Sequence, residues 1–70
     1  MERTLIAVEP DDTGWRIRLG DEFVARHLEK LRAIDRATLI ARERHQATGH
    51  PTGVHVCTLS GEAVMVGVNG

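Results

Sequence analysis

The chain has 70 residues, of which 41% are hydrophobic and 27% are charged, and its formal net charge is −1. This balance excludes an intrinsically disordered chain, which combines low hydrophobicity with high net charge, and also a strongly basic or acidic tail. A domain of this length buries only about 60% of the surface that its unfolded chain exposes. The single cysteine, Cys57, cannot form an internal disulfide, so no covalent cross-link supports this small core.

Membrane and export signals are absent from the sequence pattern. No apolar run approaches the ~20 residues that span a bilayer. The N-terminal segment 1–4 (MERT) lacks the basic start and long apolar stretch of a signal peptide. We therefore expect a cytoplasmic protein without membrane association, folded as a single domain over residues 1–70.

Two segments near the N-terminus predict the first β-strands. Residues 4–8 (TLIAV) are partly β-branched and end at residues 10–14 (PDDTG), a cluster of turn-forming residues. Residues 15–19 (WRIRL) alternate strictly between apolar and basic side chains. A period of two over five residues predicts a strand with its apolar residues on one face and its arginines on the other.

Residues 21–48 allow two interpretations. Their content of Glu, Arg, Leu and Ala favours helix throughout, which would give a β-β-α-β-β order with one long broken helix over 21–48. The apolar positions of such a helix, however, fall on two different faces. We favour a second hairpin strand over residues 22–28, followed by a helix from about residue 29 to residue 48.

The favoured hairpin has a three-residue loop, Gly20 to Glu22. Its apolar side chains then share one side of the sheet, through the facing pairs Leu19–Phe23, Ile17–Ala25 and Trp15–His27. The predicted buried stripe of the helix consists of Leu31, Ile34, Ala37, Thr38 and Ala41.

The C-terminal third predicts a further hairpin. Gly49 stands where the left-handed cap of the helix belongs, and Pro51 follows it. Residues 53–59 and 62–68 are predicted strands, joined by a turn at residues 60–61. The element order is therefore β-β-β-α-β-β, an α+β fold in which one helix packs across one face of an antiparallel sheet.

Three short motifs lie along this order of elements. They are Trp15-Arg16-Ile17, then Ala33-Ile34-Asp35-Arg36-Ala37 with Ala41, and then Val54-His55-Val56 with Gly61. Their arrangement resembles that of a group of short, uncharacterised bacterial domains, and the β-β-β-α-β order is similar to that of HicB-like antitoxins. The resemblance covers roughly residues 14–61 and consists of packing and turn positions. It implies the same fold and, as one functional class, an antitoxin-like regulator linked to nucleic acid.

Four histidines raise the question of a metal site: His27, His45, His50 and His55. Zinc requires three or four ligands that converge on one point, usually with short paired spacings. A site of His50, His55 and Cys57 is one interpretation. Surface histidines with an apolar cysteine are the simpler one. We therefore expect no metal and no cofactor.

The sequence also lacks the residue groupings that are typical of catalytic sites. Cys57 and His55 stand two residues apart on one predicted strand and have no third group to orient them. The adjacent acidic residues fall in predicted turns, and no glycine-rich loop precedes a helix. We therefore expect that the protein is not an enzyme.

Arginine accounts for eight of the nine basic residues, since Lys30 is the single lysine. In the predicted register, one cluster emerges on the sheet face away from the helix: Arg16, Arg18 and Arg26. Such a cluster can hold a phosphate or a partner's carboxylate bidentately. The alternative is a solvated face, neutralised by Glu9, Glu22 and Glu62. Overall neutrality and the lack of interleaved aromatic residues weaken a nucleic-acid interpretation.

The last hairpin is apolar on both faces, yet one helix covers only one face of a sheet. Its final strand has no charge after Glu62 and so forms a poorly protected edge. We expect a twofold homodimer whose interface includes Cys57, Leu59, Val64, Met65 and Val66. Alternatively, the first strand covers part of this surface.

Two functional classes follow. The first is a non-catalytic interaction module that acts as a homodimer and binds a protein partner. The second is a nucleic-acid-linked regulator that uses the arginine-bearing sheet face. HicB-type antitoxins usually add a DNA-binding segment, and we expect no room for one after Val68, which favours the first class.

Overall fold

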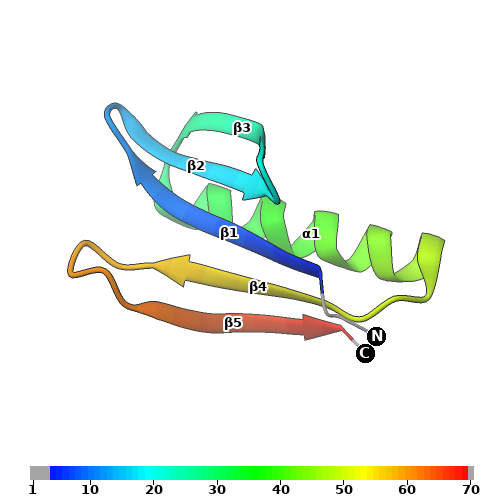
Figure 1. Cartoon of the computed structure of the whole chain (residues 1–70). Helices are drawn as coiled ribbons and strands as arrows, with labels where there is room; N and C mark the ends of the chain where they lie inside the picture. Colours follow the sequence, from blue (N-terminus) through cyan, green and yellow to red (C-terminus); the bar gives the residue numbers. More distant parts are fainter. Residues whose placement is uncertain (1–3, 70) are drawn as a thin grey trace.

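The computed structural model describes residues 4–69. Its elements are β1 (Thr4–Asp11), β2 (Gly14–Leu19), β3 (Glu22–Leu28), α1 (Lys30–Thr48), β4 (Thr52–Cys57) and β5 (Ala63–Asn69). Figure 1 shows the helix lying across one face of a single five-stranded sheet. The α+β fold and the order β-β-β-α-β-β are thereby confirmed, and β3 excludes one long helix over 21–48. Residues 1–3 and 70 of the predicted domain lie outside the described part of the chain.

The strands are ordered β3-β2-β1-β4-β5 across the sheet. Neighbouring strands are antiparallel except β1 and β4, which are parallel. The expected sheet was antiparallel throughout, whereas the observed sheet is mixed. The direction follows from the connections: β1 and β3 run the same way, α1 runs back across the sheet, and β4 then runs parallel to β1 (Figure 1).

The turn between β2 and β3 is shorter than expected. Two residues, Gly20 and Asp21, connect the strands, so Leu19 pairs with Glu22 rather than with Phe23. Gly20 has a φ of 61°, which glycine adopts without a steric penalty and which a two-residue hairpin of type II′ requires at this position.

Two register shifts then change which face the β3 side chains occupy. The pair Ile17–Ala25 is confirmed, but Phe23 pairs with Arg18 and so lies on the face away from α1, where it was not expected. Near the end of β3, Leu28 rather than His27 pairs with Trp15. His27 is an extra residue in this ladder and has a φ of 60°.

The helix contacts the sheet through a row of alanines, four residues apart and fully buried: Ala33, Ala37 and Ala41. They pack against the buried aliphatic side chains of the sheet, Ile6, Val8, Ile17, Val54 and Val56. Ala37 and Ala41 belong to the predicted stripe. The prediction for Leu31 is wrong, because its position two residues before Ala33 is on the opposite side of the helix, where it is 75% exposed.

The end of α1 is fixed by the predicted cap and by a buried hydrogen bond. Gly49 has a φ of 73°, and its N–H donates to the His45 carbonyl at 2.8 Å. The buried hydroxyl of Thr52 donates to the Ala41 carbonyl at 2.9 Å, which ties the start of β4 to the helix. α1 is too polar to cross a membrane, and the described residues contain no other helix.

Candidate interaction surfaces

The three predicted arginines of β2 and β3 lie together on the sheet face away from α1, and each has a carboxylate partner on β1. Arg16 Nε donates to Glu9 Oε1 at 3.0 Å, and Arg18 Nη2 donates to Glu9 Oε2 at 3.1 Å. Arg26 Nε donates to Asp11 Oδ2 at 3.3 Å. We define these five residues as the arginine cluster.

Phe23 sits within this cluster. The guanidinium carbons of Arg16 and Arg26 lie 4.5 and 5.4 Å from the centroid of its ring, which is a cation–π arrangement. Neither Phe23 nor Asp11 was predicted to lie at this cluster. Asp11 could have been found, because it has the same parity as Glu9 if β1 continues through Pro10. Within residues 4–69, neither Glu22 nor Glu62 forms an ion pair.

The ion pairs favour the charged forms of the acids. The hydrogen bond from Arg18 lowers the pKa of Glu9 against the opposing effect of burial, and Arg16 lowers it further. The backbone N–H of Asp12 and then Arg26 lower the pKa of Asp11. In return, Glu9 raises the pKa of Arg18. Each arginine of the cluster is therefore ion-paired, and the two carboxylates leave the cluster with one net positive charge.

The histidines and the cysteine do not form a ligand set. Among the described residues, no three His, Cys, Asp or Glu side chains are placed to hold a metal ion. His45 Nδ1 lies 2.9 Å from the His50 carbonyl oxygen, and His27 hydrogen-bonds Thr13. His55 and Cys57 point to the uncovered sheet face from β4, because the alternate residues Val54 and Val56 are in the core.

β5 forms a free edge of the sheet, and its apolar side chains are only partly covered: Val64, Met65, Val66 and Val68 are 46–57% exposed. No charged residue occurs after Glu62. β5 has one register shift against β4, between Met65 and Gly67, whereas the opposite edge, β3, carries Glu22 and Arg26 and has two register shifts. Charges and irregularities protect an edge from pairing with another chain, so β5 is the less protected edge.

The predicted interface residues lie on different sides of this edge. Cys57 and Met65 face the uncovered side of the sheet, as their register with the inner strands shows. Val64 and Val66 face the helix side and line an apolar cavity of about 280 Å³ with Ile34 of α1. Leu59 is in the β4–β5 turn, where it is 87% exposed.

The turn also determines which backbone groups of β5 point outward. The N–H of Thr58 donates to the Glu62 carbonyl at 2.7 Å, so these two residues form a hydrogen-bonded pair. Hydrogen-bonded and non-hydrogen-bonded pairs alternate along an antiparallel ladder. Val56–Val64 is therefore hydrogen-bonded, while the N–H and C=O groups of Ala63 and Met65 point away from β4, toward the free edge.

Comparisons with protein-family models, with curated proteins and with solved structures find no match for this chain. The similarity to HicB-like antitoxins therefore stays a sequence-based prediction. We assign a function from the chemistry of the surfaces themselves.

Proposed function

We propose that the protein is a non-catalytic interaction module that forms a homodimer through β5 and binds a protein partner. The observation that carries this proposal is the unprotected β5 edge, with four apolar side chains about half exposed and no charged residue after Glu62. Pairing with the same strand of a second copy satisfies the outward backbone groups and removes apolar surface from water.

A twofold axis beside Met65 makes the edge self-complementary. In antiparallel pairing about this point, Met65 lies opposite the partner's Met65, and the outward N–H and C=O groups of Met65 in each copy bond those of the other. Val64 and Val66, the extra residue of the β5 register shift, lie on either side of this point and bring apolar side chains to the helix side of the interface. No charged side chain is introduced between residues 63 and 67 of either copy.

The second copy also covers the apolar cavity between β5 and α1. Val64, Val66 and Ile34 line that cavity together with Lys30, Val56 and Thr58. Paired copies form one continuous sheet from two sets of five strands, with both helices on the same face. The other face then presents two arginine clusters.

The partner-binding part of the proposal rests on this uncovered face. Phe23 is 46% exposed between two guanidinium groups, and aromatic and arginine side chains are enriched at protein interfaces. The alternative, a nucleic-acid-linked regulator, is less well supported. Glu9 and Asp11 already form ion pairs with the three arginines that would contact phosphates and leave the cluster one net positive charge.

Light scattering coupled to size-exclusion chromatography tests the dimer. We expect the mass of two chains for the wild type and of one chain for Met65→Lys, because two ammonium groups would meet at the axis. Leu31→Lys is the matched control: it adds the same charge at an exposed site on α1 and should leave the dimer intact. A monomeric wild type, or a dimeric Met65→Lys protein, would refute the proposal.

A cross-link distinguishes edge pairing from face-to-face packing. Hydrogen-bonded antiparallel neighbours have Cα atoms about 5.5 Å apart, within the usual range for a disulfide. Met65→Cys in a Cys57→Ser background should therefore oxidise to a covalent dimer, whereas Val68→Cys in the same background should not. Equal cross-linking of both variants would contradict the proposed register.

A further inference from the structure

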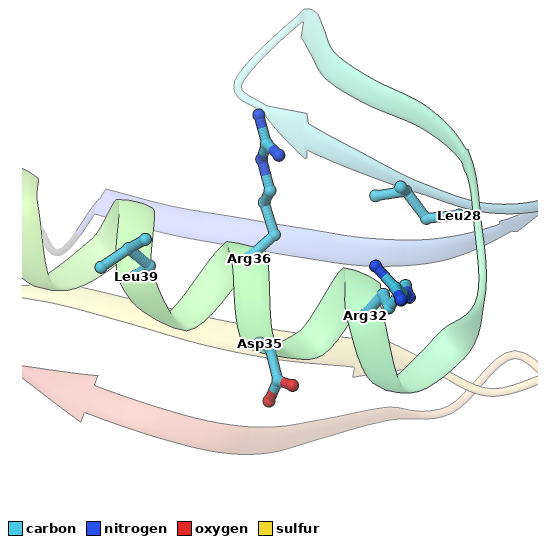
Figure 2. A pocket seen from close by; sticks show the side chains of 5 residues that line it. All are labelled: Leu28, Arg32, Asp35, Arg36 and Leu39. Atoms are coloured by element: carbon cyan, nitrogen blue, oxygen red, sulfur yellow. The ribbon is translucent and has the colours of Figure 1, made fainter.

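A second hollow lies on the outer side of α1, next to the end of β3. It has a volume of about 550 Å³ and is lined by Leu28, Arg32, Asp35, Arg36 and Leu39. Figure 2 shows Arg32 beside Leu28 and Arg36 extending in the direction of the β2–β3 hairpin, whereas Asp35 points the other way, toward β5. The lining therefore includes two guanidinium groups that extend in different directions, one carboxylate and two leucines.

The lining residues of this hollow carry a net positive charge, with two arginines against Asp35. Within the described part of the chain, neither Arg32 nor Arg36 forms an ion pair, although all three arginines of the arginine cluster do. Arg32 and Arg36 are four residues apart on one side of α1, a spacing at which like charges repel and destabilise a helix. An anion held between them would remove that repulsion.

The surroundings limit the kind of anion. Guanidinium groups bind phosphate and carboxylate oxygens in bidentate geometry, and two of them match a doubly charged group. Leu28 and Leu39 offer apolar contact to whatever carries that group. Glu43 lies two helical turns after Arg36 and so on the same side of α1. Its carboxylate would repel an extended polyanion that follows the helix beyond Arg36.

We propose that this hollow binds a compact phosphate monoester with an apolar substituent, its phosphate between Arg32 and Arg36 and its substituent against Leu28 and Leu39. The hollow is open to solvent, since Arg32, Arg36 and Leu39 are exposed, and its volume admits a compact ligand. The site is on the side of α1 away from the sheet, so it does not depend on the β5 dimer. Each proposal can therefore fail without the other.

Isothermal titration with phenyl phosphate tests the site. We expect Arg32→Gln/Arg36→Gln to weaken binding by about tenfold or more, because charge-assisted hydrogen bonds are lost. Arg42→Gln/Arg44→Gln is the matched control, since it removes the same charge from the same helix outside the hollow. Its affinity should change by less than about twofold. Equal losses in the two double variants, or no binding to the wild type, would overturn the proposal.

The apolar part and the source of the phosphate are tested separately. Inorganic phosphate should bind more weakly than phenyl phosphate, and Leu39→Ala should reduce that difference. Equal affinities for the two probes would refute the apolar contact. Sedimentation with phosphatidylcholine vesicles that contain phosphatidic acid should show no binding that depends on Arg32 and Arg36. Such binding would identify a lipid headgroup and contradict a free ligand.

Discussion

The alanine row of α1 provides a sharp test of how the helix packs on the sheet. Ala37 is fully buried at its centre, and a leucine there adds three carbon atoms to a site without free space. Overpacking of this kind costs about 1–3 kcal/mol. Proteins have roughly 0.05–0.15 kcal/mol of stability per residue, which gives about 4–10 kcal/mol for 70 residues. Ala37→Leu should therefore remove a large fraction of the free energy of unfolding.

Urea unfolding followed by far-ultraviolet circular dichroism, at one protein concentration, measures this loss. With a denaturant slope of about 1 kcal/mol/M for a domain of this size, the midpoint should fall by roughly 1–3 M. Ala47→Leu makes the same change at an exposed position of α1, where helix propensity hardly differs. Its stability should stay within about 0.5 kcal/mol of the wild type. Equal midpoints for the two variants would show that the alanine row does not set the distance between helix and sheet.

Two further changes test the turn into β2 and the arginine cluster. In Gly14→Ala the new Cβ would lie 2.7 Å from the Leu28 carbonyl oxygen, so we expect a loss of about 1–3 kcal/mol in thermal unfolding. Gly67→Ala meets only ordinary contacts at 3.8 Å and should cost less; the reverse order would contradict the close approach at Gly14. Glu9→Gln should cost about 1 kcal/mol at neutral pH, because two ion pairs are lost. Since the pKa of Glu9 is lowered in the folded state, this stabilisation is present above the ordinary pKa of 4.5 and is lost as the pH falls through the folded-state pKa. Wild type and Glu9→Gln should thus converge in melting temperature as the pH falls below the folded-state pKa of Glu9, and a pH-independent difference would exclude the ion pairs as its cause.

Local sequence patterns determined the order of the elements, because each pattern depends on residues close together in the chain. Alternation predicted β2, the Gly49 cap predicted the end of α1, and the turn residues separated β4 from β5. The same alternation predicted that Arg16 and Arg18 share the face away from the helix. The absence of charge after Glu62 predicted an unprotected edge strand, and the strand order places this strand, β5, at one edge of the sheet.

Tertiary structure decided the features that depend on how distant segments meet. The direction of β4 relative to β1 follows from three intervening elements, and the shifts in β3 that turn Phe23 toward the arginines arise from cross-strand pairing. Composition showed that arginine is abundant but not which arginines are paired. The registers of β1 with β2 and of β2 with β3 give each arginine of the sheet a carboxylate partner. Within residues 4–69, Arg32 and Arg36 of α1 form no ion pair. Periodicity assigns a side chain to a face, but only the packed fold brings it to a partner.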